Sequence, residues 1–406
     1  MSRKASLWAA IAALFSAIAL IGVTLPDEAA QALAPAAQHL DHASAALSAP
    51  ADGAWRSGGP YGGLVQALAL SPAFASDGLA FAGGWRAGPG GGTIGYGIVR
   101  TDDFGQSWSP VFHSAPWTQL AVFDLATSFA FDSDDTAFAA TDGGLLRTRN
   151  RGNTWERLGG GLPAAGSDPT ADDVRRVYLS PAYAADGVLV ALMADGTLFR
   201  SADRGDTWTR LSIGRTFAAA FSRDFASSNT ISAVILTGEP PALALARSTD
   251  RGDTWAVVQP LALSPVTDLV EVADAALLVA TENGVARLAP DGAGYTPEPV
   301  ALNISGAVHR LAVAGDHVYA AGQNGLFISL SAGRGWQRYA DTPSTAFLSV
   351  AVCPHWGRCH ALMAGSYAGV LGTLDDNLEP WRWLAGVRRL NTKAVAASPT
   401  YATDGT

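Results

Sequence analysis

Lysine and charge are scarce in this sequence. Only 16% of its 406 residues are charged, and lysine occurs only as Lys4 and Lys393, so arginine supplies nearly all of the positive charge. The formal net charge is −9 and the pI is about 5.2. An acidic chain with few basic residues is a poor match for nucleic acid or for an anionic membrane surface. We therefore expect no nucleic-acid partner.

Helical periodicity is also missing. Between residues 53 and 406 no segment repeats apolar residues at the helical spacing with capping residues at its ends. Short apolar runs bounded by turn residues take its place, and the chain holds 44 glycines, which match the many turns. Near the start of this region, such runs predict strands at 64–70, 79–82, 97–101 and 107–112. The sequence therefore predicts an all-β fold.

A repeated eight-residue motif organises the chain. It begins with Thr or Ser, carries Asp or Asn at the third position and Gly at the fifth, and ends with Ser or Thr before Trp. The full copies carry Asp103, Asn150, Asp203 and Asp250 and end at Trp108, Trp155, Trp208 and Trp255. Their tryptophans follow one another at intervals of 47, 53 and 47 residues, close to the roughly 40 to 50 residues of a four-stranded propeller blade. Looser copies end at Tyr295, Trp336 and Trp381, which gives seven units.

A second repeated phrase, Ser-Pro followed by an aromatic residue and then Asp-Gly, begins at Ser71, Ser180 and Ser398. Because the last copy starts an eighth unit, we expect an incomplete ring: seven blades with a surplus tail, or eight blades with one or two strands missing. We favour seven. The segment 53–57 resembles a lone fourth strand, which predicts that the ends of the chain, including residues 392–398, close the ring.

The residue types of the motif suit a tight turn. An Asp or Asn oxygen accepts backbone N–H bonds from the residues ahead of it, and Gly permits a positive φ. The Trp ring that follows can fill the wedge between blades and donate its indole N–H to a backbone oxygen. A calcium loop is the alternative, but each copy offers only one acidic position where such loops need several. We expect a structural role and no metal or other cofactor.

The motif resembles the Asp-box, or BNR repeat, of bacterial sialidases, sortilin-type receptors, xyloglucanases and photosystem II assembly factors. The resemblance covers roughly residues 53–406. It implies a β-propeller in which each box lies on the turn between the third and fourth strands, at the propeller edge and away from any catalytic centre. A structural role for the Asp or Asn of each full copy follows from the resemblance.

The N-terminus predicts export. Arg3 and Lys4 precede an uncharged apolar stretch at 5–25, which is typical of a cleaved signal peptide or of a single membrane anchor of about 20 residues. Both readings place the following domain outside the cytoplasmic membrane. We divide the chain into a signal or anchor at 1–26, an Ala- and Pro-rich linker at 27–52 and a propeller at 53–406.

The only two cysteines, Cys353 and Cys359, lie six positions apart. In an oxidising compartment this pair most simply closes a loop as a disulfide. Two free thiols are an alternative, and so is a metal site that adds His355 and His360.

The binding face is predicted from loop variability. Connections between second and third strands, and between blades, differ from unit to unit, and variable loops on a rigid repeat are the usual place for a binding site. The candidate residues on this face are Trp85, Arg86, Tyr96, His113, Trp117, Asp172, Asp173, Glu239, Glu282 and Tyr367.

Two functions are compatible with this face. A sialidase-like enzyme should carry a Phe/Tyr-Arg-Ile-Pro motif, which is absent, and a xyloglucanase-like enzyme needs two opposed acids, for which Asp172 or Asp173 could face Glu239 or Glu282. A non-catalytic module that binds a protein, peptide or glycan needs neither feature. We favour the binding module, with a glycoside hydrolase as the alternative and a membrane contact only through an N-terminal anchor.

Overall fold

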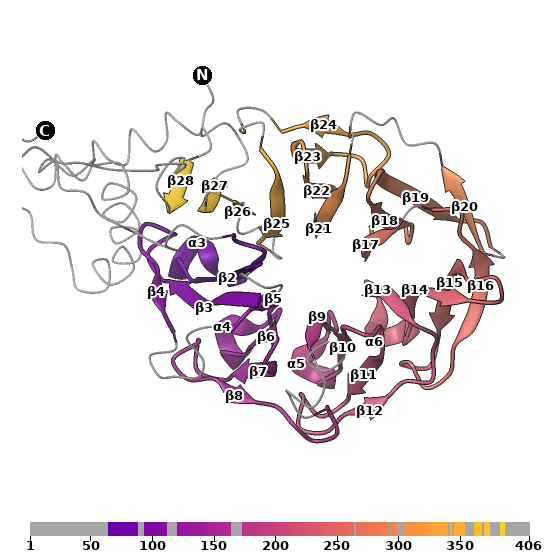
Figure 1. Ribbon diagram of the computed structural model, residues 1–406, viewed down its shortest axis with the longest axis horizontal. Helices are drawn as coiled ribbons and strands as arrows, with labels where there is room; N and C mark the ends of the chain where they lie inside the picture. Colours follow the sequence, from indigo (N-terminus) through magenta and orange to yellow (C-terminus); the bar gives the residue numbers. More distant parts are fainter. Residues whose placement is uncertain are drawn as a thin grey trace, which may run out of the picture. The chain divides into compact units, whose positions relative to one another are not determined.

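A computed structural model describes residues 64–385, apart from gaps at 88–92, 112–119, 164–172, 264, 293, 299–303, 305, 340–341, 343–344, 354–360, 368 and 374–381. Contacts divide the chain into residues 1–55 and 56–406, and all described residues belong to the second unit. They form seven four-stranded antiparallel sheets arranged as a β-propeller around a central axis (Figure 1). The predicted all-β class and seven blades are confirmed.

The blades follow one another along the chain. The first blade contains β1 (Ala67–Leu70), β2 (Ala80–Ala87), β3 (Thr93–Thr101) and β4 (Ser109–Pro110). The second contains β5 (Val122–Thr127), β6 (Ala137–Thr141), β7 (Gly144–Thr148) and β8 (Glu156–Arg157). The third contains β9 (Val174–Leu179), β10 (Leu189–Met193), β11 (Leu198–Ser201) and β12 (Thr209–Arg210). The fourth contains β13 (Thr216–Phe221), β14 (Ile231–Thr237), β15 (Ala242–Ser248) and β16 (Ala256–Pro260).

The remaining three blades have the same order. The fifth contains β17 (Val266–Glu271), β18 (Leu277–Thr281), β19 (Gly284–Pro290) and β20 (Tyr295–Glu298). The sixth contains β21 (Val308–Ala314), β22 (His317–Gly322), β23 (Gly325–Ser329) and β24 (Gln337–Arg338). The seventh contains β25 (Phe347–Val352), β26 (Leu362–Ser366), β27 (Gly369–Thr373) and β28 (Arg382–Ala385). In every blade the first strand is innermost.

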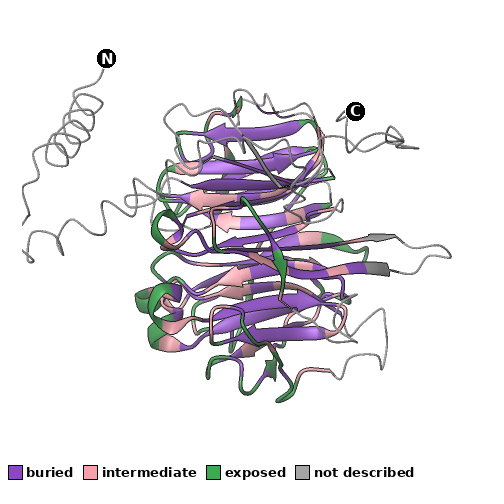
Figure 2. Ribbon diagram, turned by 90° about the vertical axis from the view of Figure 1, so that its left-hand side faces the viewer, coloured by how far each residue is buried: buried purple, intermediate pink, exposed green. Residues whose placement is uncertain are grey.

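Four one-turn helices interrupt the expected all-strand pattern. They are α3 (Phe74–Asp77), α4 (Phe131–Asp134), α5 (Tyr183–Asp186) and α6 (Phe225–Ser228), and each follows the first strand of its blade. In α3 the Ser71 hydroxyl accepts from the Ala73 N–H at 3.1 Å and donates to Asp77 at 2.7 Å. These turns are too short to show a helical period in the sequence, which explains why they were not predicted. Figure 2 shows helices of this kind on one face of the propeller, opposite the face from which the hairpin of β2 and β3 projects.

The eight-residue motifs lie on the connections between third and fourth strands. In the third blade, Asp203 accepts from the Ser201 hydroxyl at 2.7 Å and from the Thr207 N–H at 2.9 Å. The glycine of the motif is required by space as well as by conformation. A Cβ at Gly152, whose φ is +81°, would lie 2.4 Å from a ring carbon of Phe81. The motif residues therefore hold the turn and let it approach the neighbouring blade.

Arginines fasten the second, third and fourth full copies of the motif to the preceding blade. Arg147 on β7 donates through Nη1 to the Arg204 carbonyl at 2.6 Å and to Asp206 at 2.7 Å, both in the motif of the third blade. The residues that precede the first and third copies in their strands, Arg100 and Arg200, make the same pair of contacts to the following blade.

The hydrophobic core is divided among the wedges between neighbouring blades. One cluster joins Leu68 and Trp108 of the first blade to Met363 of the seventh, and the ring closes there. The Val65 N–H donates to the Ser366 carbonyl at 3.1 Å across this boundary. Both closing blades consist of consecutive strands. The expected contribution of residues 53–57 and 392–398 to closure lies outside the described residues.

Candidate binding site in the central channel

The seven innermost strands surround the channel. Each runs in the same direction relative to the ring, because each is followed by a connection on the face that carries the short helices (Figures 1 and 2). The carboxyl ends of these strands therefore open on the helix face, and their amino ends open on the opposite face, where the second and third strands are connected.

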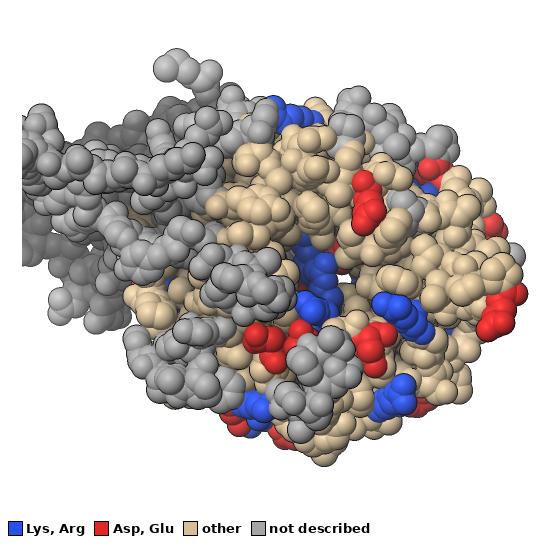
Figure 3. Space-filling model, in the orientation of Figure 1, with Lys and Arg blue, Asp and Glu red and all other residues tan. Residues whose placement is uncertain are grey.

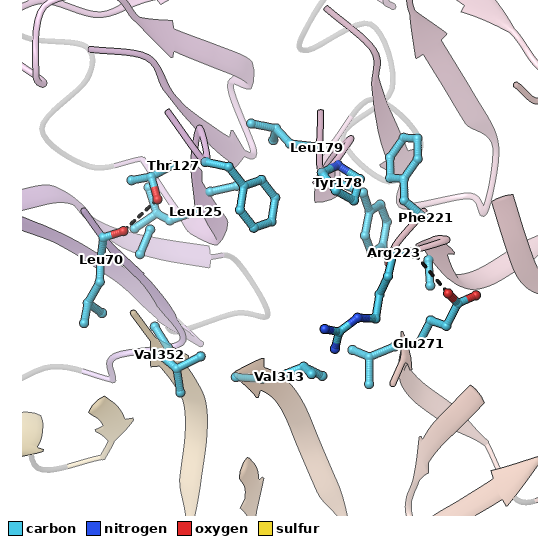
Figure 4. Close-up of a pocket in the computed structure, with 18 of the residues that line it drawn as sticks. Leu70, Leu125, Thr127, Tyr178, Leu179, Phe221, Arg223, Glu271, Val313 and Val352 are labelled. Atoms are coloured by element: carbon cyan, nitrogen blue, oxygen red, sulfur yellow. Dashed lines mark hydrogen bonds between the residues drawn. The ribbon is translucent and has the colours of Figure 1, made fainter. Parts of the chain in front are cut away.

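A cavity of about 500 Å³ opens on the helix face, and we call it the funnel. All seven blades contribute to it, and most of its wall is aliphatic or aromatic (Figure 4). Its principal apolar residues are Leu68, Leu70, Leu125, Phe129, Leu179, Phe221, Val270, Val313 and Val352. A volume of this size with an apolar wall is typical of ligand pockets.

The polar side chains of the funnel are largely engaged within the protein. The Thr127 hydroxyl donates to the Leu70 carbonyl at 2.7 Å. The buried Glu271 carboxylate accepts from the Ser222 hydroxyl and from the Arg223 N–H, both at 2.9 Å. The Arg223 side chain, which extends over the cavity in Figure 4, donates to the Gly315 carbonyl at 3.1 Å. The funnel therefore offers a ligand mainly apolar contact.

Deeper in the channel lies a layer of four charged residues, which we call the charged layer: Asp124, Arg176, Asp268 and Arg310. Each is the third residue of its innermost strand when the count starts from Val122, Val174, Val266 and Val308. The two acids are only 2% and 3% exposed.

Each acid of the charged layer ties two blades together. Asp124 accepts from the N–H of Leu125 at 3.0 Å and from the N–H of Val177, on the next blade, at 3.1 Å. Asp268 repeats this arrangement three blades later, with Leu269 at 3.0 Å and Leu311 at 2.9 Å. The acids thus satisfy backbone donors of the innermost strands at two blade boundaries.

The two arginines reach across the channel. Arg310, from the sixth blade, donates through Nη2 to Asp124 of the second blade, and its Nε lies 3.8 Å from Asp268. Arg176, from the third blade, donates to the carbonyl of Thr267 on the fifth blade at 3.0 Å. Figure 3 shows basic side chains in the hollow at the centre of the ring.

Burial controls the protonation of the two acids. It raises the pKa of Asp124 and of Asp268 to about 6, against the opposing effect of the Arg176 charge and of the backbone hydrogen bonds. Every carboxylate oxygen of the pair already accepts a hydrogen bond from the protein. Arg310 contacts both acids, and every one of their oxygens is engaged within the protein, so they present no free oxygen to a substrate.

Two of the residues predicted for the binding face are brought together on the face opposite the helices. Trp85 packs edge-on against Phe123, with ring centroids 5.9 Å apart. The guanidinium group of Arg175 lies over the same Phe123 ring, 3.9 Å from its centroid. Arg175 also forms an ion pair with Asp173 at 3.1 Å. Phe123 and Arg175 were not predicted as site residues, because they lie at strand positions where a core residue is the usual occupant.

The other predicted residues are dispersed. Tyr96 lies in β3, and Glu239, Glu282 and Tyr367 are exposed on turns of the fourth, fifth and seventh blades. The backbone of Arg86 lies in β2, whereas His113, Trp117 and Asp172 lie outside the described residues. The funnel lies at the other end of the channel. It was not predicted, because its wall residues follow the same apolar pattern as the core.

Metal ligands and membrane-spanning helices are not found in the described part of the chain. No group of three or more His, Cys, Asp or Glu residues there is arranged to hold a metal ion. None of its helices has the length and hydropathy needed to span a bilayer. Cys353 is disulfide-bonded and buried, while Cys359, His355 and His360 lie outside the described residues.

Comparisons with known proteins identify the fold. No family model and no curated protein matches the sequence. The chain is similar to a structure of YCF48 bound to D1 peptide, at 17% identity over 79% of this chain and 94% of that one, with a TM-score of 0.55.

Two further similar structures have other roles. One is the GH74 xyloglucanase from Xanthomonas campestris, at 20% identity over 82% of this chain and 56% of that one, with a TM-score of 0.59. The other is the extracellular domain of a one component system from B. thetaiotaomicron, at 16% identity over 76% and 38% of the two chains, with a TM-score of 0.53. At these identities the likeness extends to the propeller fold alone.

Proposed function

We propose that this chain is an exported, non-catalytic binding module that holds an apolar segment of a protein or peptide in the funnel. The observation that carries the proposal is the cavity of about 500 Å³ that all seven blades line with mainly apolar side chains. A rigid ring of packed blades keeps such a wall in place before the ligand arrives, which limits the entropy lost on binding.

The chemistry of the wall favours a peptide over a glycan. A sugar presents hydroxyl groups on most of its surface, and burying them without matching partners is costly. The hydroxyl of Thr127 and the carboxylate of Glu271 are already bonded within the protein. An apolar side chain gains instead from each contact with the aliphatic wall. The similar structure of YCF48 with a peptide supports this choice by analogy of fold.

Hydrolysis is less well supported. A glycosidase needs two carboxyl groups that can reach the sugar, one as an acid and one as a base or nucleophile. Asp124 and Asp268 are buried, and their oxygens are occupied by backbone donors of neighbouring blades. On the opposite face, Asp173 is paired with Arg175.

Export rests on the N-terminal sequence. Arg3 and Lys4 are followed by the uncharged stretch at 5–25, as in a signal peptide or an N-terminal anchor. One of the structures of similar fold is an extracellular domain.

The binding test uses peptides selected from a displayed random library on the immobilised protein. Affinities are then measured by calorimetry for the parent, for Val313→Asp in the funnel and for Val257→Asp, whose side chain is 57% exposed on the outer strand β16. We expect the first variant to weaken binding about tenfold or more, because a buried carboxylate would replace apolar contact, and the second to leave it unchanged. Equal affinities for all three proteins would exclude the funnel as the site.

The hydrolase alternative is tested with xyloglucan and with a chromogenic sialoside. We expect no release of product above that of the Asp124→Asn and Asp268→Asn variants. Turnover by the parent that either substitution abolishes would instead establish an enzyme.

A further inference from the structure

We propose that the charged layer forms the closed floor of the funnel. It therefore limits the length of the apolar ligand that the channel can accept. This inference rests on the proposed function, because it describes the end of the same binding site. Three observations lead to it.

The first observation is the position of the layer. The funnel wall begins at Leu125 on β5 and at Leu269 on β17, and in each strand the preceding residue belongs to the charged layer. On β9 and β21, which carry the two arginines, the wall begins at Tyr178 and Ala312, two residues beyond the layer. The cavity therefore ends one or two residues above the layer on all four blades that carry it.

The second observation is that the layer spans the channel. Arg310 extends from the sixth blade to an acid of the second, and Arg176 extends from the third blade to a carbonyl of the fifth. Both side chains are held at their far ends, so they cross the channel where a through-going ligand would have to pass.

The third observation is the chemistry of the layer. Its two acids and two arginines balance in charge, and the acids are nearly inaccessible. An apolar chain that passed this point would separate buried ion pairs and leave charges without partners, which is strongly unfavourable. Above the layer, by contrast, each methylene group that enters the funnel improves affinity about fourfold.

The depth of the site follows from the strands. The wall uses two or three residues of each innermost strand. A strand rises about 3.3 Å per residue, so the apolar part is about 7 to 10 Å deep. Affinity should therefore rise with ligand length and then stop rising. An open channel would show no such limit.

The probes are straight-chain alcohols from 1-hexanol to 1-dodecanol, titrated calorimetrically into the full chain. For the parent we expect affinity to increase about fourfold per methylene group and to become constant once the chain spans the funnel. For Arg310→Ala, which removes one crossing side chain, we expect the increase to continue to longer alcohols. Arg200→Ala is the matched control, because Arg200 binds the motif of the next blade on the far side of the sheet from the channel.

A second variant guards against loss of folding. Arg310→Met removes the charge and keeps much of the bulk, so it should shift the limit less than the alanine variant. A limit at the same length in the parent and in folded Arg310→Ala would overturn the assignment of the floor. A steady increase in the parent would also overturn it, although the apolar funnel would stand. Absence of alcohol binding, or binding that Val313→Asp leaves unchanged, would reject the funnel and the floor together.

Discussion

Arg147 and Asp206 form an ion pair 2.7 Å long across the boundary between the second and third blades. The same arginine donates to the carbonyl of Arg204, which precedes the glycine of the third motif. Its side chain is only 4% exposed. The repeated motif therefore has a partner outside its own blade, and Arg147 joins the second blade to the third.

Arg147→Ala should destabilise the protein by about 2 to 3 kcal/mol, since it removes a buried side chain that donates to the Arg204 carbonyl, to Asp206 and to Glu156. The measurement is chemical denaturation followed by circular dichroism. Arg149→Ala is the control, because Arg149 also pairs with Asp206 but is half exposed, and an exposed pair contributes at most about 1 kcal/mol. Equal losses in the two variants would contradict a special role for the buried arginine.

Asp203→Ala should also lower stability, by about 1 to 3 kcal/mol, and leave peptide affinity of the folded protein unchanged. Its carboxylate accepts from Ser201 and Thr207 in the turn, far from the funnel wall. Asp132→Ala, at an exposed position of α4, serves as the control and should change stability little. A variant that melts like the parent but loses binding would show that the motif contacts the ligand.

The charged layer predicts a dependence of stability on pH. Burial raises the pKa of Asp124 and Asp268 from 3.8 to about 6 in the folded protein, so between these values the folded state binds more protons than the unfolded state. The cost of keeping the two acids ionised is therefore present above pH 6 and is relieved as the pH falls toward 4. Each acid can contribute up to about 3 kcal/mol to this change.

The test compares urea denaturation at pH 7 and pH 5 for the parent and for the double variant Asp124→Asn with Asp268→Asn. We expect the parent to gain stability relative to the double variant on acidification. Parallel behaviour of the two proteins would mean that these acids do not titrate in this range.

The cysteines are tested by mass spectrometry of non-reduced, denatured protein. Cys353 is disulfide-bonded in the structure, so we expect a link to Cys359, resistance to alkylation and a mass two hydrogens below that of the reduced form. Reduced protein, alkylated at both positions, is the control. Labelling of both cysteines without reduction would favour the free thiols, and metal retained through His355 and His360 would favour the metal site.

The blades were predictable because the motif marks each one with residues that only a tight turn requires. The tryptophans of the third and fourth complete copies behave as expected: Trp208 and Trp255 donate to the carbonyls of Gly205 and Gly252, both at 3.0 Å. The fastening arginines were missed, although Arg100, Arg147 and Arg200 each stand directly before a motif. Their partners lie on another blade, and spacing within one repeat does not reveal contacts between repeats.

The candidate site was harder to predict for a different reason. The wall of the funnel consists of residues such as Leu125 and Val313, which also fit the alternating pattern of a buried strand. The charged layer left a signal, since Asp124 and Asp268 occupy equivalent positions near the start of two innermost strands. A charge at such a position is expensive unless it has a partner, and that partner lies across the ring, where sequence spacing gives no guidance.

The closure between the first and seventh blades has a mechanical consequence. The chain links consecutive blades across the other six wedges, whereas among the described residues this wedge is held by side-chain packing and by contacts such as the hydrogen bond from Val65 to Ser366. Tension applied to the two ends of the propeller would therefore act on this wedge first. The ring should open first at this boundary, and the remaining blades would then separate one after another from the two exposed ends.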